Sequence, residues 1–123
     1  MNTKYTVVNL ESERAKGRKW IFGPFRPQED TTFSATLELG YVNLNEVETT
    51  DQLHFHTTAE EYYVMMSGYM RINVESEIIE VSAGEVLVVR SNTEHLILYV
   101  QPNTRILLLK SPASTGDKVV IAR

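Results

Sequence analysis

The chain has 123 residues, 42% of them hydrophobic, which is enough to fill the core of one domain but not of two. Its formal net charge is −4, with lysines and arginines scattered among acidic residues, and this excludes the basic stripe that nucleic-acid binding needs. The chain has no cysteine, which excludes disulfide bonds, thiolate metal ligands and a cysteine nucleophile.

Membrane insertion is not expected from the sequence. No run of apolar residues approaches the roughly 20 that are needed to cross a bilayer. Residues 1–5 are not followed by the apolar core of a signal peptide. The absence of cysteine is compatible with a reducing compartment. We therefore expect a cytoplasmic protein with neither a membrane nor a nucleic-acid partner.

Short alternating runs of apolar and polar residues, separated by turn residues, predict an almost all-β structure. In chain order, the expected strands span residues 6–10, 19–22, 31–43, 53–56, 61–67, 69–74, 77–81, 86–89, 95–100 and 104–110. Residues 11–19 have a turn-like pattern, and a surface loop at 111–118 precedes a last short strand at 119–121. Strands of this length and even spacing are typical of a sandwich, jelly roll or barrel.

Two expected strands, residues 86–89 and 96–100, are apolar on both faces. A strand with one face in water would alternate more regularly. The opposite sheet can cover one face, and a second subunit is then expected to cover the other. A homodimer is therefore predicted. The N-terminal aromatic residues are expected to pack on the barrel or on the partner, without a catalytic role: Trp20, Phe22, Phe25 and Phe33.

All three histidines of the chain belong to one predicted cluster. His54 and His56 are two residues apart on an expected strand, so both imidazoles project from the same face. After a polar turn, Glu60 or Glu61 should bring a carboxylate beside them, and the residues themselves leave this choice open, with Glu61 favoured. His95 begins a later strand that becomes adjacent if the barrel closes.

This cluster favours a metal site over ordinary packing. A lone histidine on an apolar face is usually a core or surface residue, but here every histidine falls into one group beside an acid. Nitrogen and carboxylate ligands suit a divalent transition metal ion, with iron first and manganese, nickel or zinc as alternatives.

The spacing His54-x-His56-x4-Glu61-x6-Gly68 resembles the first motif of the cupin family. The spacing Gly84-x5-Arg90-x-Asn92-x2-His95 resembles the second. This resemblance implies one cupin domain over residues 1–123, with a core at about 31–110, folded as a double-stranded β-helix or small jelly-roll barrel. It also implies that His54, His56, Glu61 and His95 are the metal ligands, which decides for Glu61 over Glu60.

The sequence departs from the cupin pattern at four positions, none of them a ligand: Glu48, Arg90, Asn92 and Tyr99. Asn92 replaces a glycine and can adopt the same left-handed turn conformation. Arg90 replaces a proline and is expected either to lie on the surface or to reach into the pocket mouth and pair with a substrate carboxylate or phosphate.

Alternation along the strands predicts further residues around the site. Gln52 should share a face with His54. On the same grounds Tyr63 and Met65 should lie beside Glu61, and Ile97 and Tyr99 beside His95. Most of these should simply fill the barrel. Tyr63 and Tyr99 are nevertheless candidate catalytic residues, together with Arg90, because a buried phenol can donate a hydrogen bond to a substrate or a bound water.

Two functions follow from a metal site in such a barrel. The first is a metalloenzyme acting on a small carboxylate, phenolic or sugar-like molecule, by dioxygenase chemistry or by decarboxylation or isomerisation. The second is a non-catalytic binding or sensing module. The enzyme is favoured, because the chain contains no second domain through which a sensor could act.

Overall fold

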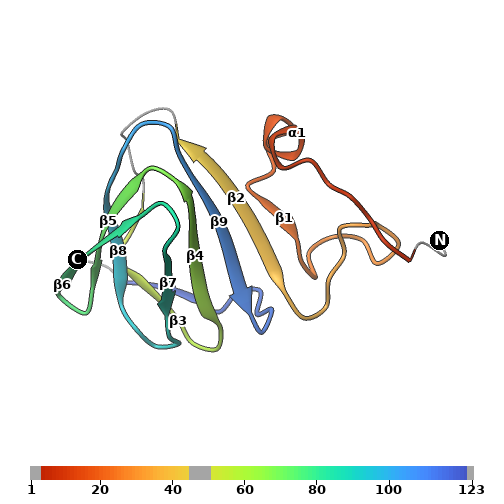
Figure 1. Ribbon diagram of the computed structural model, residues 1–123. Helices are drawn as coiled ribbons and strands as arrows, with labels where there is room; N and C mark the ends of the chain where they lie inside the picture. Colours follow the sequence, from red (N-terminus) through yellow and green to blue (C-terminus); the bar gives the residue numbers. More distant parts are fainter. Residues whose placement is uncertain (1–3, 45–50, 122–123) are drawn as a thin grey trace.

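The computed structural model describes residues 4–44 and 51–121. Two five-stranded sheets dominate the structure and pack face to face (Figure 1). The elements are α1 (Leu10–Ala15), β1 (Trp20–Phe22), β2 (Glu38–Leu44), β3 (His54–His56), β4 (Glu60–Ser67), β5 (Tyr69–Val74), β6 (Glu77–Ser82), β7 (Val86–Val89), β8 (His95–Val100), β9 (Thr104–Ser111) and β10 (Lys118–Val120).

The order of the strands is that of a small jelly roll. The first sheet has the order β1-β2-β9-β4-β7, and the second sheet has the order β10-β3-β8-β5-β6. All the strand pairs in both sheets are antiparallel. Consecutive strands such as β3 and β4 lie in different sheets, so the chain passes repeatedly from one sheet to the other. The predicted all-β, jelly-roll fold is confirmed.

The N-terminal segment differs from the sequence prediction. No strand forms at residues 6–10, because α1 begins at Leu10 and the Asn9 side chain caps it by accepting a hydrogen bond from the Ser12 backbone N–H. An asparagine cap followed by acidic residues in the first turn stabilises a helix start, and this outweighs the short apolar alternation. With six residues, α1 is too short to cross a membrane, and no other helix occurs in residues 4–44 and 51–121.

The predicted strand 31–43 was also too long at its start. Residues 31–37 form turns, and regular pairing begins at Glu38. The Asp30 carboxylate holds the first of these turns by accepting hydrogen bonds from the backbone N–H and the hydroxyl of Thr32. Glu48, one of the four departures from the cupin pattern, lies outside the described residues.

The space between the sheets changes in character from one end to the other. Along the inner face of β4, Glu61, Tyr63 and Met65 follow one another, and all three are buried. In the paired strand β9, Lys110 lies opposite Glu61, and Ile106 lies opposite Met65. One end of the barrel is therefore polar, while the other holds the hydrophobic core, formed by Tyr63, Met65, Met70, Ile72, Val81, Val89, Val100, Ile106 and Leu108.

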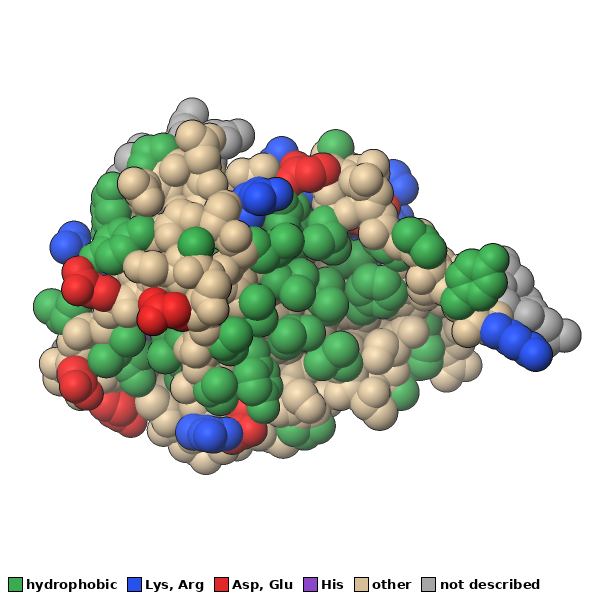
Figure 2. Space-filling view, viewed as in Figure 1, with side chains coloured by type: hydrophobic (Ala, Val, Ile, Leu, Met, Phe, Trp, Pro, Cys, Tyr) green, Lys and Arg blue, Asp and Glu red, His purple; other side chains and the backbone are tan. Residues whose placement is uncertain are grey.

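The outer faces of the two sheets also differ. Strand register places eight apolar residues on the outside of the first sheet, which we call the outer apolar face: Leu39, Tyr41, Tyr62, Val64, Val86, Val88, Leu107 and Leu109. Figure 2 shows hydrophobic side chains gathered at the centre of the view, where β4, β9 and β2 run in Figure 1. On the second sheet, polar side chains such as Arg71, Glu80 and Asn73 point outward.

Gly68 connects β4 to β5, at a corner where the chain passes between the sheets. Its φ is +84°, and a Cβ atom placed there would lie 2.0 Å from Oγ1 of the fully buried Thr104. Gly84 has a similar φ of +87°, but a Cβ atom there would meet nothing within 4 Å. The two glycines share the backbone strain that a side chain would suffer and differ only in the available space.

Gly68→Ala is therefore expected to destabilise the protein more than Gly84→Ala. The left-handed backbone costs either alanine about 1 kcal/mol. Gly68→Ala should lose a further ~1–3 kcal/mol because it overpacks a buried corner. Denaturant unfolding of the two variants measures the difference. Equal midpoints would contradict the structure at this corner.

Candidate metal centre

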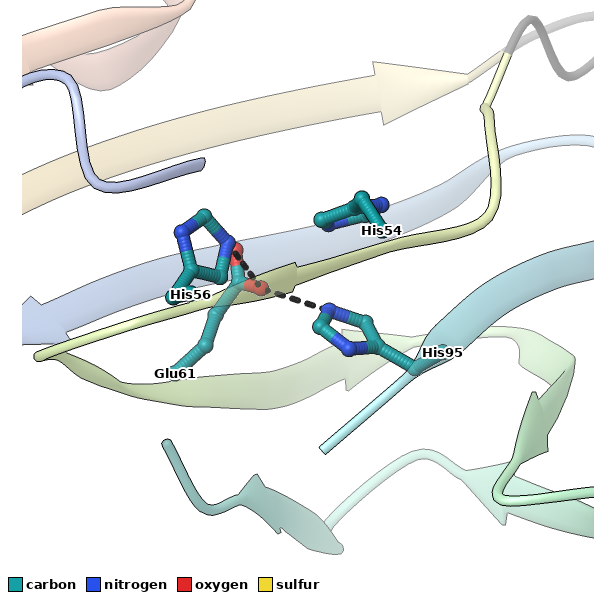
Figure 3. A group of neighbouring side chains, drawn as sticks. All are labelled: His54, His56, Glu61 and His95. Carbon is teal, nitrogen blue, oxygen red and sulfur yellow. Dashed lines mark hydrogen bonds and ion pairs between the residues drawn. The ribbon is translucent and has the colours of Figure 1, made fainter. Parts of the chain in front are cut away.

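Four side chains from three strands meet at the polar end of the barrel. His54 and His56 come from β3, Glu61 from β4 and His95 from β8. His54 lies directly opposite His95 in the second sheet, while Glu61 reaches them from the first sheet. One ligand atom from each residue lies within 4.8 Å of the others, and all four side chains are buried. Figure 3 shows them converging on a common point.

The three imidazoles are held in the same tautomer. Nδ1 of His54 donates to the Gln52 carbonyl at 2.6 Å, and Nδ1 of His95 donates to the Thr93 carbonyl at 2.8 Å. Since a carbonyl can only accept, both Nδ1 atoms carry the proton. Nδ1 of His56 donates to Asp117 Oδ1 at 3.0 Å. In a neutral imidazole the Nε2 lone pair is then free, as metal ligation requires.

These lone pairs face a carboxylate. Glu61 Oε1 lies 3.1 Å from Nε2 of His95 and 3.3 Å from Nε2 of His56. His56 Nε2 is buried and has no hydrogen-bond partner. Two acceptors this close repel each other unless a positive charge lies between them, and either a proton or a metal ion could supply it. The residues therefore fit a bound cation.

The pKa shifts within the cluster also indicate that positive charge is favoured there. Burial opposes the charged forms of both Glu61 and His56. Their mutual contact nevertheless lowers the pKa of the Glu61 carboxyl well below its usual range and raises the pKa of the His56 imidazole. For His54, burial prevails and lowers the pKa of the imidazole. A neutral His54 is a ready ligand.

The buried charges around the cluster favour a cation with two charges. Three buried carboxylates, Glu38, Glu61 and Asp117, face the single buried ammonium of Lys110. Lys110 Nζ lies 3.1 Å from Asp117 and 3.6 Å from Glu38, so it is shared between them. Buried charges are strongly unfavourable unless they are compensated. With the histidines neutral, as metal ligation requires, two negative charges remain, and a divalent metal ion would neutralise them.

Tyr63 lies at the boundary between the cluster and the core. Its hydroxyl donates to Glu61 Oε1 at 3.0 Å. Burial, and then the charge of Glu61, raise the pKa of the phenol well above its usual value, so it stays neutral and remains a donor. The position predicted for Tyr63, on the same face as Glu61, is confirmed.

A cavity of about 350 Å³ opens above the cluster. His54, His56, Glu61 and Tyr63 form part of its wall. The apolar part of the wall is formed by Trp20, Val42, Leu44, Ile97, Val100, Ile106 and Leu108, and the charged part also includes Lys19, Glu38, Asp51, Lys110 and Lys118. The volume suits a small organic molecule.

Two of the candidate catalytic residues do not line this cavity. Arg90 lies on the surface with its side chain 68% exposed and donates to Glu60 at 2.8 Å. Tyr99 was expected on the face of His95, but the pairing of β5 with β8 shifts register between Ile97 and Tyr99. Because this bulge adds a residue, Val100 takes the inward position and Tyr99 stacks against Arg71 outside.

The smaller predictions around the site have mixed outcomes. Ile97 lines the cavity and Met65 is buried in the core, as expected. Gln52 is exposed and contributes only its backbone carbonyl, to His54. Asn92 has a φ of 60°, so it adopts the left-handed conformation predicted for it. Trp20, to which no binding role was given, forms part of the cavity wall.

Asp117 is the main site residue that sequence reasoning missed. Besides His56 and Lys110, its carboxylate accepts hydrogen bonds from the backbone N–H groups of Ala59 and Thr58. Burial opposes its charge, but these donors lower the pKa of Asp117 to about 2. Asp117 lies 61 residues from His56 in a segment read as a surface loop, so no local pattern indicated the contact.

The comparisons with known proteins agree with this fold. The family model described as "Cupin domain" matches residues 40–101, which include all four clustered residues and cover half of the chain. The protein belongs to the cupin family. A search among curated proteins found no match.

Solved structures share the fold at low sequence identity. A variant of Streptomyces PAC13 with uridine is 18% identical, with a TM-score of 0.62 over 72% of this chain and 71% of that one. Pac13 is described as a nucleoside dehydratase. KdgF from Halomonas sp. is 18% identical with a TM-score of 0.56, over 80% and 92% of the two chains. Oxalate decarboxylase from Bacillus subtilis is 18% identical with a TM-score of 0.56, and the match covers 72% of this chain and 24% of that one. These likenesses show the fold alone.

Asp117→Asn is expected to lower the affinity of the cluster for a divalent ion by about 10- to 100-fold, because His56 loses the charged partner that orients it. Glu38→Gln is the matched control, since it removes the other acceptor of Lys110 and leaves Asp117 on His56. Competition titration with a chromophoric chelator and Co²⁺ measures both affinities. Equal affinities would show that Asp117 does not position His56.

Proposed function

We propose that this protein is a metal-dependent cupin enzyme whose chain forms one cupin domain. His54, His56, Glu61 and His95 hold one divalent transition metal ion, with iron first and manganese, nickel or zinc as alternatives. The substrate is a small organic molecule that enters the cavity above the ion. The reaction is of dioxygenase type first, with decarboxylation or isomerisation as the alternative.

One observation carries this proposal. Three imidazoles and a carboxylate converge in the protein interior, and three of these four residues also line a cavity whose remaining wall is partly apolar and partly charged. A purely structural polar cluster would satisfy its own hydrogen bonds, whereas this one leaves the His56 Nε2 atom without a hydrogen bond, although Glu61 Oε1 lies only 3.3 Å away. An apolar lining with a few convergent polar groups is also the usual form of a small-molecule site.

The chain and the ion would contribute differently to the reaction. When bound, the ion supplies Lewis-acid or redox chemistry at coordination positions left open by four protein ligands. The apolar wall excludes water and holds the body of the substrate. Tyr63 keeps its proton and donates a hydrogen bond to Glu61 Oε1, which fixes the orientation of that carboxylate. Asp117 fixes the ring of His56 in the same way.

Adjacent glutamates provide a matched test of the metal site. Glu61 belongs to the cluster, whereas Glu60 pairs with Arg90 on the surface. Protein purified without chelator is expected to hold about one metal ion per chain. Glu61→Gln should lose most of it, and Glu60→Gln should retain it. Mass spectrometry of the metal content measures this, and equal content in the two variants would contradict the proposed ligand set.

Turnover is then tested with the metal-loaded protein. Oxygen uptake and product formation are followed with small carboxylates, phenols and sugars, with His54→Ala as the inactive control. Metal binding without turnover on any of these classes would favour a non-catalytic binding module. A melting temperature that is unchanged by chelator would argue against a well-occupied site, because an ion bound only by the folded state at 100 times its Kd adds about 2.7 kcal/mol.

We also infer that a second copy of the chain covers the outer apolar face. Four strands carry this face, β2, β4, β7 and β9, and their lengths with a strand spacing of about 4.8 Å give a footprint of roughly 400 Å². This is about half of the ~800 Å² per partner of a standard interface, so residues around the face would contribute the rest. Two such faces are complementary to each other across a two-fold axis, as the inner faces of a sandwich are.

Val64→Lys is expected to convert the dimer to a monomer, because it places a charge at the centre of this face. Ile78→Lys is the matched control, since Ile78 is 62% exposed on the outside of the second sheet. Sedimentation velocity at micromolar concentration measures both masses. A monomeric wild-type protein, or a dimer that survives Val64→Lys, would overturn this interface.

A further inference from the structure

The charged residues around the cavity are not equivalent, because the acidic ones are already engaged. Glu61 belongs to the metal cluster, and Glu38 is paired with Lys110 and accepts from the Ser114 backbone N–H. Asp51 accepts from the Ile97 backbone N–H at 2.8 Å and lies 3.8 Å from His54 Nδ1. Each of these three carboxylates therefore already has partners within the protein.

The available charge at the cavity is positive. Lys19 and Lys118 line it, both are exposed, and neither forms an ion pair with any residue in 4–44 or 51–121. Lys19 directly precedes β1, and its carbonyl is fixed by the Tyr41 backbone N–H. Lys118 begins β10 with its Cα opposite that of His56, so its side chain leaves the sheet on the same face as the imidazole.

We propose that the ligand of this cavity is a small amphipathic carboxylate. Its anionic group pairs with Lys118 and Lys19 at the mouth, and its apolar body lies against Trp20 and the aliphatic wall. This inference rests on the proposed function and names the substrate class for that same site. No arginine within residues 4–44 and 51–121 lines the cavity, so its described wall lacks the planar fork that binds phosphate in a bidentate manner, whereas the ammonium groups of Lys19 and Lys118 can each pair with a carboxylate oxygen.

The inference is tested with three simple probes: hexanoate, its neutral isostere hexanamide, and acetate. Titration followed by NMR, in metal-loaded and in chelator-treated protein, is expected to show hexanoate binding at least tenfold more tightly than either of the others. The comparison with hexanamide measures the contribution of the negative charge to affinity, and the comparison with acetate measures the contribution of the apolar body. Similar affinities for hexanoate and hexanamide, or no binding of any probe, would overturn the inference.

Lysine variants test which residues bind the carboxylate of the ligand. The double variant Lys19→Ala and Lys118→Ala is expected to reduce the preference for hexanoate over hexanamide to about onefold, in protein that still holds its metal. Lys16→Ala is the control, because this exposed lysine pairs with Glu13 on α1 and does not line the cavity. A preference that survives the double variant would show that another group, such as the ion itself, binds the carboxylate.

The two proposals fail in different ways. Loss of metal in Glu61→Gln depends on the cluster, whereas the hexanoate preference of chelator-treated protein depends on the mouth lysines. A protein that holds metal but does not distinguish hexanoate from hexanamide retains the proposed function and loses this inference. A protein that holds no metal and still prefers hexanoate loses the proposed function alone.

Discussion

The polar end of the barrel is governed by one electrostatic constraint: imidazole lone pairs and a carboxylate are buried within contact distance of one another. Such an arrangement is unfavourable unless positive charge lies among them. The surrounding structure maintains it rather than relieving it, because each Nδ1 atom is held by an acceptor from outside the cluster. The Gln52 and Thr93 carbonyls and the Asp117 carboxylate thus keep the Nε2 atoms directed inward.

Stability and function are separated along the same strands. The inner face of β4 carries Glu61, then Tyr63, then Met65. Tyr63, only two positions after the site residue Glu61, already belongs to the hydrophobic core. The apolar end stabilises the fold through burial and close packing. The polar end can then keep buried charges and a cavity that would destabilise a domain built around them alone. Tyr63 belongs to both, with its ring in the core and its hydroxyl on Glu61.

Membership in the cupin family fixes the architecture and not the reaction. The structural neighbours carry different names, from nucleoside dehydratase to oxalate decarboxylase, on one fold at 18% identity. What distinguishes this chain must therefore lie in its own cavity wall. Trp20, the mouth lysines Lys19 and Lys118, and the buried pairing of Lys110 with Asp117 all lie outside the segment that the family model matches.

The sequence by itself determined the all-β class, the position of most strands and the four clustered residues, because alternation and motif spacing are local properties of the chain. It also indicated the left-handed turn at Asn92. Only the tertiary structure decided which residues surround the cluster. A single bulge in β8 turns Tyr99 outward, Arg90 finds Glu60 on the surface, and Asp117 returns from the far end of the chain to hold His56. These outcomes depend on register and on long-range contacts, and neither leaves a periodic signal in the sequence.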